Sequence, residues 1–301
     1  MDKIGIITVT FNSEKVLEPF LTCIQNQNYK NYILVIVDND SSDLTLDILN
    51  QQFDNRIKTI KNNSNLGVAK ANNQGVDVAL NKKCDKILFL NNDVEFSNSF
   101  LRNLVEAQRK IGCSLIAPKM MYFKNPKYIW YAGAWFVKNK GFLPIHRGIN
   151  ELDKGQYNNI AKVDYAPTCC LMLDKQVIYD IGLMDEKYFV YFDDTDFAYR
   201  IYKDKRHHIY YYPDEVLLHK VGSLTKSFVN NQKIIRGDFF LQQNTKNHIY
   251  FLKKIGGLFS YLFIVWLFFK NNLKFIFNSD IKKDFTTFLL INRSYFKGLK
   301  M

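Results

Sequence analysis

One carboxylate and one histidine in this 301-residue chain have the chemistry of a divalent-cation site. Asp93 stands three residues past the end of an apolar run, and His219 closes another. Mg²⁺ and Mn²⁺ prefer oxygen ligands, bridge carboxylates to substrate phosphates, and accept neutral imidazole. A lone carboxylate in a turn is more often structural, and a histidine after an apolar run is more often a core or surface residue. Each therefore needs further ligands nearby to form a metal site.

Three carboxylates crowd together in the segment 192–200. Asp193, Asp194 and Asp196 lie within four residues of one another and repel unless something neutralises them. Such crowding can raise one pKa and produce a general base. The same residues also suit a helix N-terminus, where Asp favours the cap and the helix dipole. The segment is consistent with both roles at once.

Two more polar segments follow apolar runs. Residues 37–43 include Asp38, which can accept hydrogen bonds from a base or a ribose, although Asp, Asn and Ser are equally typical of turns and helix caps. Residues 65–75 include Gly67, which permits an unusual backbone angle at a loop-to-helix junction, followed by Asn72 and Asn73. Taken alone, the first segment favours a turn, and the second fits a capped helix entry as well as a binding loop.

The elements that position these residues alternate between strand and helix. Apolar, β-branched runs predict strands at 4–10, 33–37, 56–60 and 86–90. Helices are expected between them: one capped by Asn12 or Ser13, one through Leu46 and Leu49, and one over 68–80. The first of these would bury Val16, Leu17, Phe20, Leu21 and Ile24.

This alternation predicts an α/β fold with a Rossmann-like, mainly parallel central sheet flanked by helices. Ligands of such sheets bind at the carboxyl ends of the strands. The polar segments 10–12, 38–43 and 91–93 all stand at those ends. Beyond residue 112 the pattern predicts hairpins and loops over 120–160, a strand at 168–173, a helix at 194–203, a strand at 208–212 that stops at Pro213, and a basic helix over 232–255.

The order of these segments resembles glycosyltransferase family 2, the inverting GT-A enzymes, and most closely its rhamnosyltransferase-like branch. The matches run from residue 4 to about residue 222. They are TVTFN (8–12), VDNDSSD (37–43), NLG (65–67), LNND (90–93), FDDTD (192–196) with Arg200, and PDEVLLH (213–219). No single motif is specific, and the resemblance is carried by six motifs in the right order and spacing.

The resemblance implies roles for the matching residues. Asp93 would bind Mg²⁺ or Mn²⁺ in a DxD-type motif, with His219 as a further ligand. Asp194 would be the catalytic base, with Asp193 as a near alternative. The expected nucleotide-binding residues are Thr10, Phe11, Asn12, Asp38, Asn65, Gly67, Asn73 and Asn92, with Asp38 bonded to the base. Asn91 stands at the first DxD position, so Asp93 and Glu95 form an alternative, shifted pair.

The function that the resemblance implies is inverting transfer of a sugar from a UDP- or dTDP-sugar, dTDP-rhamnose included. The acceptor would be a saccharide or a lipid-linked glycan in lipopolysaccharide, O-antigen or capsule synthesis. The alternative is a catalytically inactive relative that binds sugar nucleotides or acts as a scaffold. A sugar-1-phosphate nucleotidyltransferase is disfavoured, because it would need a Gly-rich loop where this chain has Thr10 to Ser13.

The basic character of the chain belongs to its C-terminal part. The net charge is +12, and residues 220–301 hold fourteen Lys and Arg against three Asp, which leaves about +1 for the rest. No nucleic-acid-binding motif accompanies this charge, so a nucleic-acid partner is not expected. The uncharged run 258–269 is too short to span a membrane.

We therefore expect two parts, a GT-A catalytic domain over 1–222 and a helical extension over 223–301. Aromatic residues and flanking lysines suit contact between the extension and an anionic membrane surface. The alternative is packing on the catalytic domain or on a partner subunit. The oligomeric state is left open, a homo-oligomer included.

The expected location is the cytosol, at the inner face of the cell membrane. The five cysteines form no CxxC pair, and the adjacent Cys169 and Cys170 are typical of buried thiols in a reducing compartment. No N-terminal signal peptide is expected, since a strand-like run follows Lys3 directly.

Overall fold

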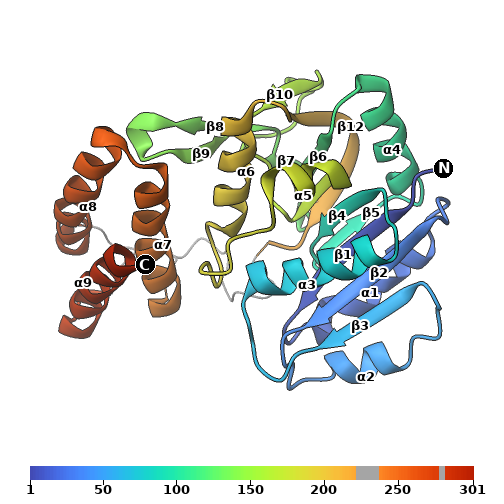
Figure 1. Cartoon of the computed structure of the whole chain (residues 1–301), viewed down its shortest axis with the longest axis horizontal. Coiled ribbons are helices and arrows are strands. Elements are labelled where there is room, and N and C mark those ends of the chain that lie inside the picture. The colour runs from blue at the N-terminus through green and yellow to red at the C-terminus, as the bar shows by residue number, and fades with distance from the viewer. Residues whose placement is uncertain (222–236, 278–281) are drawn as a thin grey trace.

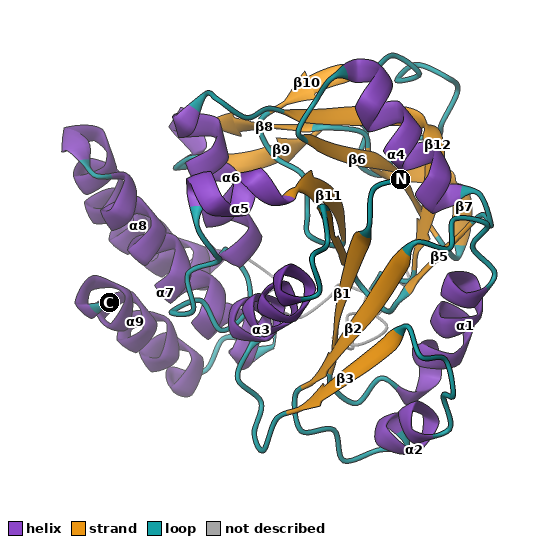
Figure 2. Ribbon diagram, turned by 45° about the vertical axis from the view of Figure 1, so that its right-hand side comes forward, coloured by secondary structure: helices purple, strands orange, loops and turns teal. Residues whose placement is uncertain are grey.

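The N-terminal half of the protein is a parallel sheet with helices on both faces. The computed structural model describes residues 1–221, 237–277 and 282–301. Strands β1 (Ile4–Thr10), β2 (Tyr32–Asp38), β3 (Ile57–Lys61) and β4 (Lys86–Leu90) run parallel in the order β3-β2-β1-β4. Helix α3 (Val68–Asn81) covers one face, and α1 (Glu14–Gln25) and α2 (Thr45–Asn50) lie toward the other (Figures 1 and 2).

These elements follow from local sequence chemistry. Strands β1, β2 and β4 consist largely of Ile, Leu, Val and Phe, which suits strands that are covered on both faces. The predicted apolar face of the first helix is confirmed, since α1 buries those five residues and no others. The predicted strands and helices of this half all form, with ends displaced by only one or two residues.

The second half of the sheet is mixed. Beyond β4 the order continues β11-β6-β12-β10, in which β11 (Cys170–Asp174) is antiparallel to both neighbours and β12 (Ile209–His219) is parallel to β6 (Leu115–Tyr122). The short strands β10 (Ala161–Val163) and β5 (Val94–Phe96) pair with β12, and β7 (Asn125–Tyr131) pairs with β6. Strands β8 (Ala134–Val137) and β9 (Leu143–His146) form a separate hairpin, so hairpins occupy much of 120–160, as predicted.

Three helices complete the body of the molecule. They are α4 (Phe100–Ile111), α5 (Lys175–Ile181) and α6 (Asp193–Asp204), and a short 3₁₀ turn, η1 (Lys138–Lys140), joins β8 to β9. Helix α4 ends at Gly112, whose φ of 69° is the left-handed conformation common after a helix. Helix α6 begins within one residue of the prediction and carries the acidic cluster in its first turn.

The prediction that the last strand stops at Pro213 is wrong. Strand β12 continues to His219, and its register with β6 shifts between Tyr212 and Val216. Proline has no N–H to donate to the ladder, but a β-bulge needs no regular pairing at that position. The bulge thus absorbs Pro213, and the strand resumes on its far side.

The C-terminal part is a set of three helices, α7 (Asp238–Ile255), α8 (Gly257–Phe277) and α9 (Phe285–Lys300), at one end of the molecule (Figure 1). The predicted 222/223 boundary and residues 232–236 of the predicted helix lie outside the described residues. Helix α7 packs Tyr250 and Phe251 against Tyr188 and Phe192 of the body. The other face of α7 forms a second core with α8 and α9.

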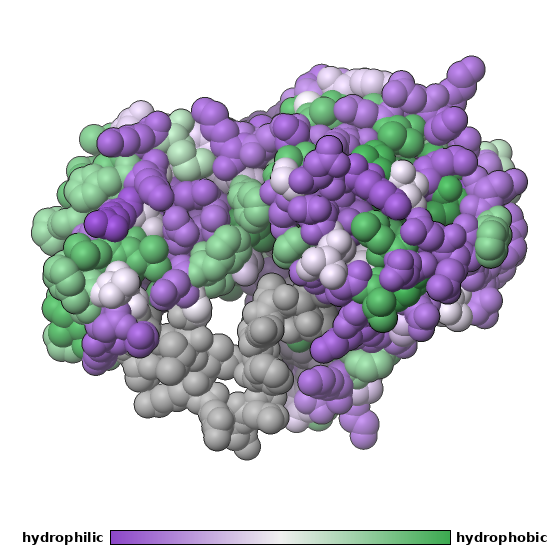
Figure 3. Space-filling model, turned by 90° about the horizontal axis from the view of Figure 1, so that it is seen from below, coloured by the Kyte–Doolittle hydropathy of each residue, from purple (hydrophilic) through white to green (hydrophobic). Residues whose placement is uncertain are grey.

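Helix α8 turns an apolar face to the outside. Its exposed large side chains are Leu258, Tyr261, Leu262, Val265, Trp266, Phe269, Leu273, Ile276 and Phe277. These positions recur every three or four residues along the full length of the helix, so they form one stripe. Figure 3 shows hydrophobic residues gathered over this end of the molecule. In the part of the chain that the structure describes, no helix is long and apolar enough to cross a membrane.

Candidate functional site

The ends of β1 and β2 are joined through the Asp38 carboxylate. Thr10 lies opposite Asp38 in the ladder, and its hydroxyl donates to Asp38 Oδ1 at 2.8 Å. Ser41 donates its hydroxyl to the same oxygen at 2.6 Å and its amide to Oδ2 at 3.0 Å. Asp38 is fully buried and accepts three hydrogen bonds within the protein. It holds two loops together, and its predicted bond to a base stays a prediction.

The loop after β1 leaves one aromatic ring exposed. Asn12 adopts a φ of 52°, and its amide donates to Ser41 Oγ at 2.9 Å while its Oδ1 accepts from the Ser42 amide at 2.9 Å. Asn tolerates this left-handed conformation better than most residues do. The preceding Phe11 is 45% exposed. A rigid loop with an exposed ring at a strand end is suited to stacking on a nucleobase.

Gly67 and Asn73 tie α3 to the segment 184–189, and Asn65 supports Gly67. Asn65 Oδ1 accepts the Gly67 amide at 3.0 Å, and Asn73 exchanges two hydrogen bonds with the backbone of Met184. Gly67 has a φ of 85°, and a Cβ there would lie 2.4 Å from the carbonyl oxygen of Phe189. No side chain fits at that distance. These residues fix the approach to α6, and their contact with a nucleotide stays a prediction.

Asn92 links the ends of β1 and β4. Its Nδ2 donates to the carbonyl of Val9 at 3.1 Å and to Ser13 Oγ at 3.0 Å. Its Oδ1 is buried without a hydrogen-bond partner among the described residues. A buried acceptor without a hydrogen bond destabilises the folded protein, so this position favours a ligand or a water molecule that donates to Asn92 Oδ1.

The structure brings Asp93 and His219 together. Strand β5 pairs antiparallel with the end of β12, which sets Val94 opposite His219 and brings the Lys220 amide to the Asp93 carbonyl at 2.8 Å. His219 Nε2 then lies 3.4 Å from Asp93 Oδ1, and both side chains are buried. Burial alone would lower the pKa of His219, but the adjacent Cys169 and the Asp93 carboxylate raise it above its ordinary value.

This pair fits a divalent cation as two of its ligands. Two neighbouring ligands of an octahedral Mg²⁺ stand roughly 3 Å apart, close to the 3.4 Å between these two atoms. Among the described residues, no group of three His, Cys, Asp or Glu side chains could hold an ion. Substrate oxygens and water usually complete the shell of Mg²⁺. In the shifted alternative, Glu95 would bind the cation together with Asp93. The Oε1 of Glu95 instead lies 2.6 Å from the ammonium of Lys220.

The three carboxylates of α6 differ in their surroundings. Asp196 is buried and neutralised, with Arg200 Nε at 3.0 Å and Lys254 Nζ of α7 at 2.7 Å. Asp194 accepts from neutral groups, the Tyr165 hydroxyl at 2.6 Å and the Thr195 hydroxyl at 3.2 Å. Among the described residues, cations therefore balance the negative charge of the cluster only at its third member, Asp196.

Burial raises the pKa of both Asp193 and Asp194 above the ordinary range, and in Asp193 the neighbouring carboxylate adds to the effect. The predicted crowding effect therefore occurs in the direction that favours a general base. Asp193 is 4% exposed, whereas Asp194 is only partly buried. Asp194 is thus the better placed of the two to meet an acceptor hydroxyl.

A run of aromatic rings connects the two acidic regions, and sequence reasoning missed it. The ring of Trp130 lies 4.4 Å from that of His219 and 5.9 Å from that of His146, whose ring lies 5.7 Å from Tyr165. The Tyr165 hydroxyl then reaches Asp194. Trp130 and His146 come from 120–160, which the sequence identified only as hairpins and loops, and Tyr165 lies just beyond it. The dense aromatic composition of that region was the one available signal.

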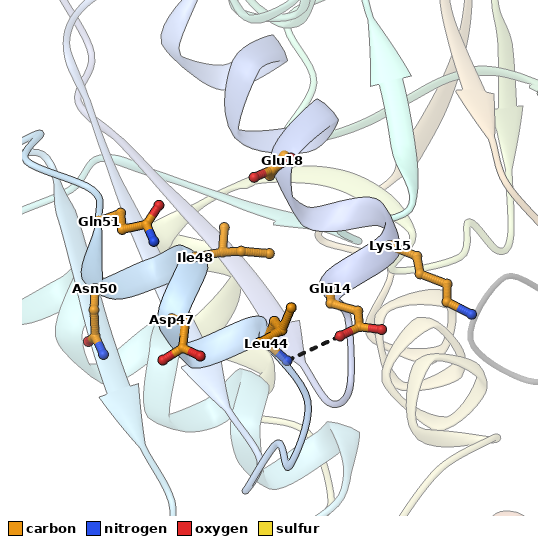
Figure 4. Close-up of a pocket in the computed structure, with 8 residues that line it drawn as sticks. All are labelled: Glu14, Lys15, Glu18, Leu44, Asp47, Ile48, Asn50 and Gln51. Carbon is orange, nitrogen blue, oxygen red and sulfur yellow. Dashed lines mark hydrogen bonds between the residues drawn. The ribbon is translucent and has the colours of Figure 1, made fainter.

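One surface hollow lies apart from this site. It measures about 770 Å³ and lies between α1 and α2 (Figure 4). Its lining carries the carboxylates Glu14, Glu18 and Asp47 against one cation, Lys15. This charge would repel a diphosphate, and no predicted site residue lines the hollow.

Comparison with known proteins identifies relatives in sequence. A family model described as glycosyl transferase family 2 matches residues 5–181. The low-salt glycan biosynthesis hexosyltransferase Agl10 of Haloferax volcanii is 26% identical over 201 residues, which cover 66% of this chain and 62% of that protein. The dTDP-rhamnosyl transferase RfbF of Shigella flexneri is 27% identical, covering 72% of this chain and 68% of that protein. This chain therefore spans less than two thirds of Agl10.

Solved structures show the same fold at low sequence identity. Residues 1–349 of Staphylococcus aureus TarS, in complex with UDP, have a TM-score of 0.53 and 16% identity, covering 83% of this chain and 65% of that one. GalNAc-T7 with UDP, GalNAc and Mn²⁺ has a TM-score of 0.62 and 13% identity, covering 84% of this chain and 48% of that one. The predicted GT-A architecture is confirmed by these likenesses.

Replacing Tyr165 with Phe should raise the pKa of Asp194 further. The Tyr165 hydroxyl bonds to the carboxylate and favours its ionised form, so it holds the pKa below the value that burial alone would give. A ¹³C-carboxyl NMR titration of selectively labelled protein measures the change. The control is Tyr131→Phe, which removes the buried hydroxyl that bonds to the Tyr165 carbonyl and leaves the Asp194 bond in place. An Asp194 pKa that is unchanged or lower in Tyr165→Phe would contradict the assignment.

Proposed function

The chain belongs to glycosyl transferase family 2, and on that premise we propose that it is an inverting glycosyltransferase. It transfers a sugar from a nucleoside diphosphate donor to a saccharide or lipid-linked acceptor in the synthesis of a bacterial surface polysaccharide. The observation that carries the proposal is Asp194, a partly accessible carboxylate with a raised pKa at the start of α6. Ring contacts and hydrogen bonds connect it to the Asp93–His219 pair.

The relatives support this substrate class. RfbF is a dTDP-rhamnosyl transferase, and a Campylobacter jejuni relative, 33% identical over 109 residues, is a β-1,3-glucosyltransferase that acts on GalNAc(5)-diNAcBac-PP-undecaprenol. We therefore propose a UDP- or dTDP-sugar as donor, dTDP-rhamnose included, and an acceptor carried on a lipid diphosphate. Lipopolysaccharide, O-antigen and capsule are the candidate products.

The chemistry follows from the positions of the side chains. Asp194 removes the proton from the acceptor hydroxyl as that oxygen attacks the anomeric carbon, and the nucleoside diphosphate leaves from the opposite face. This single displacement inverts the anomeric configuration and requires no nucleophilic Ser or Cys. The raised pKa strengthens Asp194 as a base, while the cations on Asp196 prevent a third negative charge from accumulating.

Asp93 and His219 are the residues that we propose as ligands of Mg²⁺ or Mn²⁺. When bound there, such an ion would stabilise the negative charge of the leaving diphosphate as a Lewis acid. The polar ends of β1 and β2 would receive the nucleoside, with Phe11 stacked on the base. Asn92 Oδ1, buried without a partner among the described residues, would accept a hydrogen bond from the ligand.

A catalytically inactive sugar-nucleotide-binding relative is the competing function. It would retain the loops at the strand ends without needing a base of raised pKa. The environment of Asp194 favours the enzyme over the inactive relative. A buried carboxylate beside a second carboxylate is costly to maintain unless it serves in catalysis.

Asp194→Asn should abolish transfer and leave nucleotide binding intact. Loss of a general base lowers turnover by about 10²- to 10⁴-fold, whereas Asn preserves the shape of the side chain. Release of UDP or dTDP in the presence of acceptor measures turnover, and thermal stabilisation by the nucleotide measures binding. Asp204→Asn, at the other end of α6 and paired with Arg206, should retain activity. Turnover by Asp194→Asn at the wild-type rate would exclude this base.

Asp93→Ala and His219→Ala should each remove the part of nucleotide binding that depends on Mn²⁺. A ligand that binds only the folded state raises the melting temperature, so UDP, dTDP, GDP and CMP are compared with and without Mn²⁺. Glu95→Gln is the control, since Glu95 is paired with Lys220, and its response should match that of the wild type. If Glu95→Gln and Asp93→Ala both lose the Mn²⁺ response and His219→Ala keeps it, the shifted pair of Asp93 and Glu95 is the correct one.

The exposed α8 face is proposed to contact an anionic membrane, which would bring the active site to a lipid-linked acceptor. Apolar side chains on one face, combined with the net charge of +11 in residues 220–301, are typical of helices that lie in the membrane interface. Such an orientation places the protein peripherally at the cytoplasmic face.

The paired substitution Val265→Glu and Phe269→Glu should abolish binding to vesicles that contain phosphatidylglycerol. Both side chains are exposed on α8, so the charges should oppose insertion without disturbing the core. Co-sedimentation should also weaken with added salt and on neutral phosphatidylcholine vesicles. Phe53→Glu alters an exposed aromatic residue remote from the tail and serves as control. Equal sedimentation of all variants would refute the membrane contact.

A further inference from the structure

The turn that presents the α6 carboxylates has an unusual backbone. Tyr191 and Phe192 have φ values of 64° and 69°, so two successive bulky residues adopt the left-handed conformation. Such residues avoid this region because Cβ crowds the backbone, and they persist there only when their surroundings impose it. Asp193 and Asp194 follow at once. The orientation of the first turn of α6 therefore depends on whatever holds this pair of residues.

One side chain of α7 holds both sides of that turn. Asn247 Nδ2 donates to the carbonyl of Val190 at 2.9 Å and to the carbonyl of Tyr191 at 2.8 Å. Asn247 is fully buried. Because the single amide group uses both its hydrogens on two successive carbonyls, it fits only when the turn has this conformation.

Neighbouring residues of α7 fix the surroundings of the turn. His248 stacks on Phe192 with ring centroids 5.2 Å apart, and its Nε2 lies 2.9 Å from the Gly141 carbonyl. About two helical turns further on, Lys254 Nζ lies 2.7 Å from both Asp185 and Asp196. Helix α7 thus contacts the turn, the segment before it and the helix after it.

We propose that Asn247 is a positioning residue for the catalytic base, and that α7 contributes to the active site by orienting this base. The inference rests on the proposed function of Asp194. Asn247 does not touch the reacting atoms. Its two hydrogen bonds hold the left-handed turn and so aim the Asp194 carboxylate at the acceptor. The family model ends at residue 181, so this contribution comes from a part of the chain that the model does not cover.

The test compares Asn247→Ala and Asn247→Asp with Ile249→Ala. Asn247→Asp keeps the shape of the side chain but presents oxygens to two carbonyls. Ile249 lies on the same helix, is fully buried, and packs in the tail core with Phe263 and Tyr295. Its truncation disturbs α7 without removing either bond to the turn. The Ile249→Ala variant therefore distinguishes a general loss of packing in α7 from a loss of the orientation of the Asp194 carboxylate.

Both Asn247 variants should lower kcat by about 10- to 100-fold, as expected when a reacting group is misplaced. The KM for the donor and the nucleotide-induced rise in melting temperature should not change. Ile249→Ala should retain kcat within about twofold, even if it melts at a lower temperature than Asn247→Ala. Equal losses of kcat in Ile249→Ala and Asn247→Ala, or wild-type kcat in both Asn247 variants, would overturn the proposal.

A second readout does not depend on transfer. The ¹³C-carboxyl titration of Asp193 and Asp194 should change in Asn247→Ala and remain that of the wild type in Ile249→Ala. If the wild type transfers no sugar, the proposed function fails, and the titration still decides whether Asn247 governs the carboxylates. If the wild type is active but the titration and kcat of Asn247→Ala match it, only the positioning role fails.

Discussion

The register between β5 and β12 is the constraint on which the candidate active site depends. It sets Val94 opposite His219, and therefore brings the preceding Asp93 to within 3.4 Å of the imidazole. That register exists only because β12 continues past Pro213 through a bulge. Three other strands, β5, β6 and β10, hydrogen-bond to β12. A slip of one residue would turn His219 to the opposite face of the sheet, away from Asp93.

Buried carboxylates fall into two groups according to how their charge is satisfied. Asp38 accepts three hydrogen bonds and Asp196 faces two cations, so contacts within the protein satisfy the charge of each. Asp193 and Asp194 have no cation at such distances among the described residues, and their pKa values are raised by burial. The first group stabilises the fold, whereas the second has the raised pKa values that the proposed chemistry requires.

Much of the fold was predictable because the first half of the chain has short-range, periodic patterns. The β-branched runs and the face of α1 follow directly from spacing, and the polar segments at the strand ends mark the ligand edge. Trp130, His146 and Tyr165 could not be found in this way, since the ring contacts that align them join different hairpins and loops, which no local periodicity specifies. The bonds of Asn247 to the turn before α6 are likewise invisible in the sequence, because they join residues more than fifty positions apart. The hydrogen bonds between Asn73 and the backbone of Met184 are also invisible in the sequence, and the contact of Asn73 with a nucleotide stays a prediction.

The contact between Gly67 and Phe189 has a consequence for how this scaffold can diversify. It joins backbone to backbone, with the Val68 amide 2.6 Å from the Phe189 carbonyl and no room for a side chain at position 67. An anchor of this kind depends on the glycine but not on the identity of residue 189. The side chains of the segment that leads to α6 can therefore be exchanged during evolution while its path stays fixed. Substitutions in this segment can therefore accumulate without moving the first turn of α6.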